Sequence, residues 1–144
     1  WSAEKFGFRT LLDVYDHGFE AVTVSAVASK KYLTDQRDSA RAFMRALVEA
    51  IHFTKTRADE TKKIMAKNTR ISDPGILEQA YKFIAADYLQ KPYPSIKGIQ
   101  FTLQDLDRNK PGTAELNPQR FADMELVREL ETSGFIDRVF GRKP

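Results

Sequence analysis

Cysteine is absent from the 144 residues of this chain. Disulfide bonds, thiolate catalysis and cysteine-ligated metal sites are therefore excluded. The sequence also lacks an HExxH zinc motif, a Walker phosphate loop, a GxGxxG dinucleotide motif and a GxSxG nucleophile elbow. Its carboxylates are scattered, and no two of them are spaced as an acid–base pair. We expect no catalytic residue, no metal site and no cofactor, and hence a protein that is not an enzyme.

The sequence also has no long apolar run and no segment in which charges of a single sign are concentrated. No apolar stretch approaches the length of a membrane span, so we expect no membrane insertion. The net charge is +3 with a pI near 9.1, and the charges are mixed: Lys62 and Lys63 closely follow Asp59 and Glu60. Such mixing is typical of a solvated surface rather than of a phosphate-binding stripe. We therefore expect no nucleic-acid partner.

The size of the chain suits one domain, residues 1–144. With 42% hydrophobic and 30% charged residues, the composition is that of an ordinary globular protein. A chain this long buries roughly two thirds of its unfolded surface, enough for one core. Because the first residue is Trp1 rather than Met, we expect the natural amino terminus to lie further upstream. The lack of a signal peptide here then says nothing about export.

Two short strands are predicted near the start of the chain. The first candidate is 8–15 and the second is 21–28, in which β-branched residues alternate between two faces. A polar corner at 16–18 joins them. An isolated strand pair is marginal in water, so these strands require partner strands that the sequence does not contain.

Helical patterns dominate after residue 28. About six helices are expected, and their ends carry capping signals. Gly134 is expected to close the last helix in the left-handed conformation, with Phe135 packing back on it. The signals and segments are Ser29 before a turn to Leu33, a helix at 38–54, a capping box at Thr56 and Asp59, Asp73–Pro74, Ser95, Asn117–Pro118 and a helix at 123–132.

Several side chains admit both a functional and a structural interpretation. His17 lies at the strand corner, where binding groups are common, but a turn residue without a role is the simpler interpretation. His52 lies in a strong amphipathic helix and is interpreted as a packed or half-exposed residue. Arginines at 37, 41 and 45 form a stripe that a DNA-binding helix could use, although a solvated face explains it more simply. The tyrosines at 81, 88 and 93 are interpreted as helix-packing residues.

Four segments together resemble a known family. They are "ASKKYLTDQRDSARAFMRALVEAIHFTKT", "RISDPGILEQAYKF", "KPYPSIKGIQFTLQDL" and "FADMELVRELETSGFID". In this order and with these spacings, they resemble the C-terminal part of bacterial ABC-transporter solute-binding proteins of the nitrate, sulfonate, taurine and thiamine-precursor type. The resemblance covers nearly the whole chain, from about Phe8 to Asp137.

The resemblance implies an α/β fold, a partial periplasmic-binding-protein-like lobe with two N-terminal strands followed by about six helices. It implies an extracytoplasmic protein that binds a small organic or anionic solute without chemistry and delivers it to an ABC permease. Exposed strand edges would offer a route to homo-oligomers. The corner between the strands faces the ligand cleft in such receptors, which implies these ligand-binding residues: Tyr15, Asp16, His17, Gly18 and Thr23.

A second hypothesis belongs to a different class. The chain can also be a self-contained helical interaction module without a small-molecule ligand, in which residues 8–28 form an arm that pairs with a second copy. This hypothesis predicts an oligomer that depends on protein concentration and does not respond to small solutes.

Overall fold

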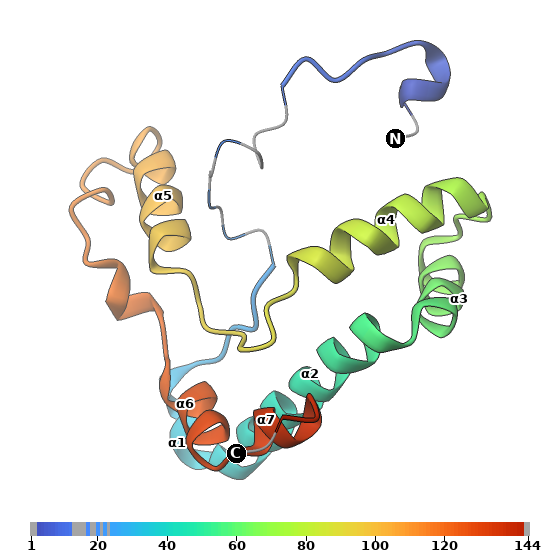
Figure 1. Cartoon of the computed structure of the whole chain (residues 1–144). Coiled ribbons are helices and arrows are strands. Elements are labelled where there is room, and N and C mark those ends of the chain that lie inside the picture. The colour runs from blue at the N-terminus through green and yellow to red at the C-terminus, as the bar shows by residue number, and fades with distance from the viewer. Residues whose placement is uncertain (1–2, 13–16, 18–19, 21, 23, 143–144) are drawn as a thin grey trace.

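The described part of the chain is helical, which contradicts the expected α/β class. The computed structural model describes residues 3–12, 17, 20, 22 and 24–142, and no strand occurs among them. Figure 1 draws the assigned elements of the described residues as coiled helices and none as a strand arrow. The remaining residues of the two predicted strands, including 13–15, 21 and 23, lie outside the described residues.

The strand prediction is wrong for 8–12 and 24–28 because these segments have no neighbour to pair with. Among the described residues, no backbone hydrogen bond links one segment to the other. Their apolar side chains are also uncovered: Leu11 is 89% exposed, and Val24 and Val27 are each 88% exposed. Alternation of β-branched residues gives strand propensity, but a strand is stable only when a ladder and a covered face support it.

Seven α-helices and two short 3-10 helices are assigned in the described residues. The elements are η1 (Ala3–Phe6), α1 (Lys30–Asp35), α2 (Arg37–Thr56), α3 (Ala58–Thr69), α4 (Pro74–Asp87), α5 (Ile96–Asp107), η3 (Pro118–Phe121), α6 (Glu125–Thr132) and α7 (Phe135–Val139).

Four of the predicted helix caps are confirmed by side-chain hydrogen bonds, among them Asn117, which accepts from the backbone N–H of Gln119 at 2.9 Å at the start of η3. The Ser29 hydroxyl accepts from the backbone N–H of Tyr32 at 3.1 Å, at the start of α1. The Asp73 carboxylate and the Ser95 hydroxyl do the same for α4 and α5, at 3.0 and 2.9 Å. Each cap satisfies a backbone donor that the first helical turn leaves unpaired.

The predicted capping box at Thr56 and Asp59 is wrong. Helix α2 extends to Thr56, and Arg57 is the N-cap of α3 without a side-chain cap. The Thr56 hydroxyl instead donates to the carbonyl of His52 at 2.8 Å. This bond to the preceding turn competes with capping, and it keeps Thr56 inside α2.

The end of the chain follows the predicted glycine signal. Gly134 has a φ of 68°, in the left-handed region, and Phe135 is buried behind it. A short helix, α7, then begins where the prediction expected only a packed residue. The left-handed glycine turns the chain sharply enough to fold α7 back toward α6 and α2.

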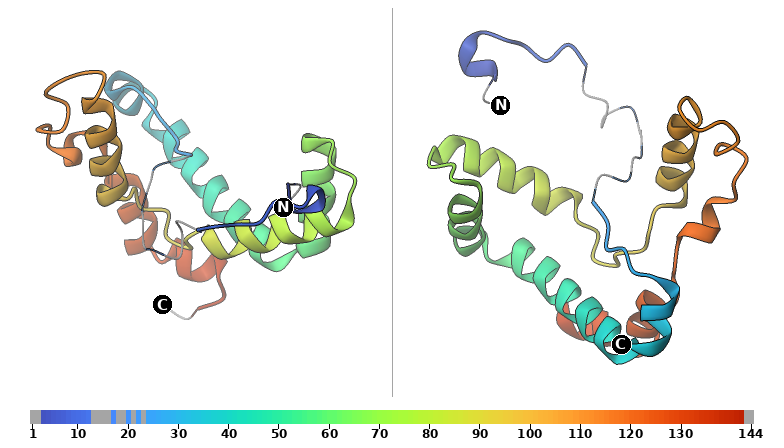
Figure 2. Two further views of the ribbon diagram at one scale, coloured as in Figure 1. Left: turned by 90° about the horizontal axis from the view of Figure 1, so that it is seen from above. Right: turned by 180° about the vertical axis from the view of Figure 1, so that it is seen from behind.

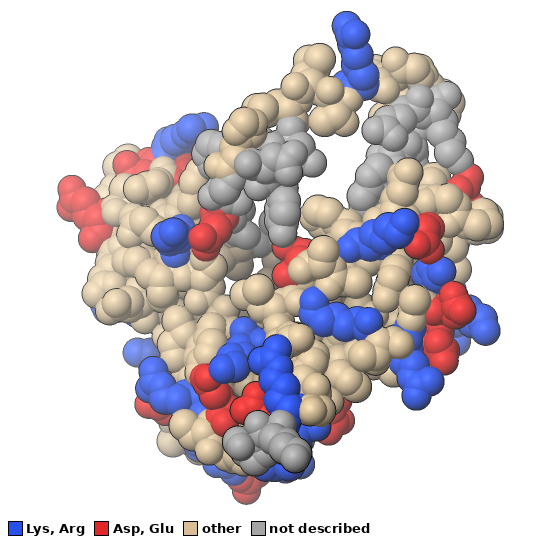
Figure 3. Space-filling model, viewed as in Figure 1, with Lys and Arg blue, Asp and Glu red and all other residues tan. Residues whose placement is uncertain are grey.

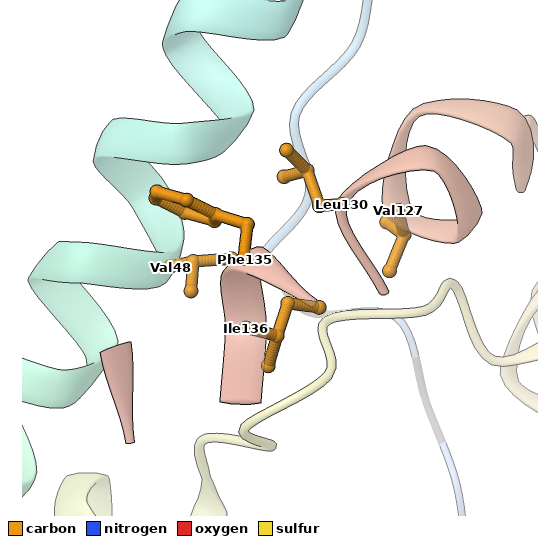
Figure 4. Packing of buried hydrophobic residues seen from close by; sticks show 5 residues of the cluster. All are labelled: Val48, Val127, Leu130, Phe135 and Ile136. Carbon is orange, nitrogen blue, oxygen red and sulfur yellow. The ribbon is translucent and has the colours of Figure 1, made fainter. Parts of the chain in front are cut away.

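The main core lies where α2, α6 and α7 meet. Val48 of α2 is completely buried and packs with buried residues of the other two helices. Figure 4 shows these side chains grouped between the helices. The buried cluster consists of Val48, Val127, Leu130, Phe135 and Ile136, with Met44, Tyr93, Val139 and Phe140 packed around it.

The other helices are arranged more openly. Helices α2, α3 and α4 follow one another and contact in pairs, and α5 makes its main helix contact with η3. Figures 1 and 2 show α5 and η3 standing apart from α4 on the opposite side of the molecule. Much of each helix surface therefore has no covering element among the described residues.

Candidate functional site

The predicted ligand-binding corner is mostly outside the described residues. Tyr15, Asp16, Gly18 and Thr23 belong to the parts that the structure does not describe, whereas His17 is described and exposed. Close by, Glu20 accepts a hydrogen bond from the Ser95 hydroxyl and lies 3.8 Å from the Lys97 ammonium. These contacts connect the segment before α1 to the start of α5, but they do not form a binding cavity.

A shallow hollow lies between α3 and α4. Its volume is about 460 Å³, and it is lined by Asp59, Lys62, Lys63, Ala66, Pro74, Leu77 and Glu78. The Lys62 ammonium lies 2.9 Å from Glu78 and 3.2 Å from Asp59. It also lies 5.9 Å from the centre of the Tyr81 ring. The central cation of the hollow is thus already engaged by this chain's own side chains.

The pKa shifts of the charged groups in the hollow support a structural role for Lys62 and Glu78. Hydrogen bonds from Lys62 lower the pKa of Glu78, and hydrogen bonds to Glu78 and Asp59 raise the pKa of Lys62. Both shifts favour the charged forms. The pair connects α3 to α4, and its groups are not tuned toward neutral pH as acid–base catalysts are.

A second ion network joins the start of α2 to α6. Glu129 accepts hydrogen bonds from Arg37 and from Arg41, the latter at 3.1 Å, and Arg37 also lies 3.4 Å from Glu125. Hydrogen bonding to Arg37 lowers the pKa of Glu129. Both arginines pair with a helix that lies 88 or more residues away, and their side chains keep 35% and 41% exposure, so this face is solvated and carries ion pairs as well.

The third arginine of that stripe also has an internal partner. The Arg45 guanidinium lies 4.5 Å from the centre of the Phe135 ring, which is buried in the main core. Such a contact covers the ring and stabilises the cation. All three arginines therefore contact another helix. Such contacts cannot be predicted from the spacing of residues within α2 alone.

Glu131 connects the proline-containing loop to α6. Its carboxylate accepts hydrogen bonds from the Lys91 ammonium and the Tyr93 hydroxyl. The hydrogen bond from Lys91 is the largest cause that lowers the pKa of Glu131, and the hydrogen bond from Tyr93 is the second. The Tyr93–Glu131 hydrogen bond also raises the pKa of Tyr93. Tyr93 packs beside the main core. The interpretation of this tyrosine as a packing residue is consistent with these contacts.

His52 makes a packing contact as well. Its ring lies 5.1 Å from that of Phe140 in an edge-to-face arrangement, and the residue is half-buried. Within the described ranges, no group of three or more histidine or acidic residues is arranged to hold a metal ion. None of the described helices combines the length and the apolar character that crossing a membrane requires.

The most distinctive feature is the extent of uncovered surface. The chain exposes 11029 Å², whereas a compact monomer of 16.5 kDa is expected to expose about 7,600 Å². Large apolar side chains contribute to the excess, among them Phe43, Phe83, Phe101 and Phe121 at 44–58% exposure. Figure 3 shows Lys, Arg, Asp and Glu interspersed on one face, with broad uncharged areas between them. A surface of this kind is typical of an interaction partner.

Comparisons of the chain with protein families, with curated proteins and with solved structures find no match.

Proposed function

We propose that this chain belongs to the solute-binding component of an ABC importer and contributes one helical layer of that receptor. The receptor binds a small organic or anionic solute without chemistry, in an extracytoplasmic compartment, and passes it to an ABC permease. The proposal rests on the four serial segments that resemble this family and not on the strands, which the fold contradicts. Each of the four segments contains a predicted cap or turn that is present in the structure: Ser29, Asp73, Ser95 and Gly134 in chain order.

The observation that carries the proposal is the uncovered apolar surface. The total exposed surface, polar and apolar together, exceeds that of a compact monomer by roughly 3,400 Å², and large apolar side chains such as Phe43, Phe83 and Phe101 are part of it. Helices that form one layer of a larger receptor bury such a surface against the remainder of the protein. On this account, the predicted ligand residues at 15–18 and 23 remain predictions.

Thermal unfolding of the natural protein, purified from its source cells, tests solute binding directly. Nitrate, taurine, an alkanesulfonate and an aminopyrimidine are added separately. A solute at a hundred times its Kd adds about 2.7 kcal/mol of stability, so the matching solute raises Tm by several degrees. We expect Tyr15→Ala to abolish the increase and the control Tyr32→Ala, at an exposed tyrosine of α1, to preserve it. No increase with any solute contradicts the proposal.

Self-association is the second candidate function, and the same uncovered surface favours it. The route through exposed strand edges is contradicted for the described residues, because they contain no strand. A helical interaction module associates through helix faces instead. It is distinguished from a receptor by an oligomer that forms with increasing protein concentration and does not change when solutes are added.

A further inference from the structure

Helix α2 presents an apolar stripe on its outer side. Phe43 is 55% exposed and Phe53 is 38% exposed, and Ala46 and Ala50 between them are exposed as well. These four residues, here named the α2 seam, are spaced by three, four and three positions. This is the spacing that places side chains along one line for pairing with another helix.

The seam lies away from the core side of the same helix. The buried residues of α2 are Ala40, Val48 and Ile51. Of these, Val48 packs with buried side chains of α6 and α7, and the partly buried Met44 packs beside them. Helix α2 thus carries two apolar surfaces, one covered and one free, although an amphipathic surface helix needs only one.

The seam is self-complementary. Read in either direction, its order is large, small, small, large. When two copies of α2 lie antiparallel, Phe43 of each copy faces Phe53 of the other, and Ala46 faces Ala50. The small central residues let the helix axes approach closely, and the rings pack at both ends, about 15 Å apart. A two-fold dimer requires a patch that matches itself in this manner.

We propose that a second copy of this chain binds along the α2 seam, with the two α2 helices antiparallel. The occupant is a second copy because the order of large and small side chains along the seam is the same in both directions. The inference does not require solute binding. It assigns a contact surface to the second candidate function, and it also applies to a receptor component that dimerises.

The antiparallel arrangement brings two like charges close together, and this distinguishes it from a parallel pair. Glu49 flanks the seam, and the pairing that joins Ala46 to Ala50 brings the Glu49 residues of both copies to the same face of the helix pair, across the two-fold axis from each other. Like charges that lie close together repel each other and disfavour the pairing. We therefore expect Glu49→Gln to strengthen the dimer by about two- to threefold, an effect that a parallel pair or another surface does not produce.

Sedimentation velocity over a range of concentrations tests the dimer on the 144-residue chain. We expect a monomer–dimer equilibrium in the unmodified protein. The double variant Ala46→Glu/Ala50→Glu places charges in the seam and is expected to weaken dimerisation at least tenfold. Ala86→Glu makes one such change at an exposed position of α4, and the single variant Ala46→Glu is the seam variant that it matches. Circular dichroism verifies that the variants keep their helices.

Cysteine crosslinking reads the direction of pairing, since the chain has no cysteine of its own. An equimolar mixture of Ala46→Cys and Ala50→Cys chains is expected to form disulfide-linked dimers faster than either variant alone. Faster crosslinking of Ala46→Cys alone overturns the antiparallel pairing. A monomer at all concentrations, or a dimer unaffected by the double glutamate variant, overturns the proposal. Because solute binding is tested separately on the natural protein, failure of one proposal is distinguishable from failure of the other.

Discussion

At the scale of single residues, carboxylates of α6 organise the charged contacts. Glu129 accepts from Arg37 and Arg41 at the start of α2, and Glu131 accepts from Lys91 and Tyr93 in the loop before α5. Both glutamates lie on α6, next to the main core. Two separate segments of the chain are therefore connected to one short helix by ionised acceptors, and the stability of these connections depends on pH.

Replacement of Glu131 by glutamine is expected to reduce the pH dependence of stability at both ends of the pH range. The pKa of Glu131 is lowered in the folded protein, so its contribution is present above about pH 4.3 and is lost as the pH falls. The pKa of Tyr93 is raised, so its contribution is present below about pH 10 and is lost as the pH rises through the folded-state value.

Urea unfolding from pH 2.5 to 11 measures this dependence. Glu131→Gln removes the carboxylate and the main cause of the Tyr93 shift, so both limbs of the stability profile become shallower. Glu115→Gln, at an exposed position of the loop after α5, is the matched control and keeps the original profile. A profile that is the same in both variants contradicts the role given to Glu131.

Val48 is the residue whose truncation tests the core most directly. It is completely buried among α6 and α7 side chains. Val48→Ala removes the two γ-methyl groups of the side chain and leaves a cavity. We expect this to lower the free energy of unfolding by about 2 kcal/mol. Val24→Ala makes the same change at a side chain that is 88% exposed and is expected to cost less than about 0.5 kcal/mol. Equal effects in chemical denaturation contradict the assigned core.

At the scale of elements, helix ends were predictable because their signals are local. Ser29, Asp73 and Ser95 cap the helices that follow them, and each cap depends on residues only three positions away. The strands at 8–15 and 21–28 were not predictable in this way, since a strand depends on partners elsewhere in the chain. The error arose from judging alternation in 21–28 without a sheet to support it.

Substitutions at the ends of α3 and α6 are expected to change the free energy of unfolding in opposite directions. Arg70 follows α3 with a φ of 59°, and Gly134 follows α6 with a φ of 68°. A side chain in this region is strained by about 1 kcal/mol, whereas glycine is not. We expect Arg70→Gly to raise the unfolding free energy by about 0.5–1 kcal/mol and Gly134→Ala to lower it by about 1 kcal/mol. Thermal unfolding of both variants checks the signs, and a loss of stability in Arg70→Gly contradicts the argument.

Contacts between elements that are distant in the chain could not be predicted from the sequence. The arginines at 37, 41 and 45 were interpreted as a solvated face, yet they pair with Glu129 and Phe135 on α6 and α7. Periodicity identifies which residues share a helix face, but it does not identify what covers that face. For the same reason the predicted ligand residues depended wholly on the resemblance, and His17, the one that is described, is exposed.

At the scale of the whole molecule, the exposed surface is the central observation. A small core at α2, α6 and α7 supports a chain that exposes 11029 Å². The hydrophobic effect favours covering such a surface, either by other parts of a receptor or by a second copy. We propose that this chain lies within a larger assembly, and the central claim of the proposal is that the assembly is a solute-binding receptor outside the cytoplasm.

An immunoblot of fractionated source cells, with an antibody raised against this chain, tests that claim most directly. The account predicts a band well above 16.5 kDa that is released with the extracytoplasmic fraction, because the receptor contains the surfaces that cover these helices. A band at 16.5 kDa that remains with the cytoplasm contradicts the receptor proposal.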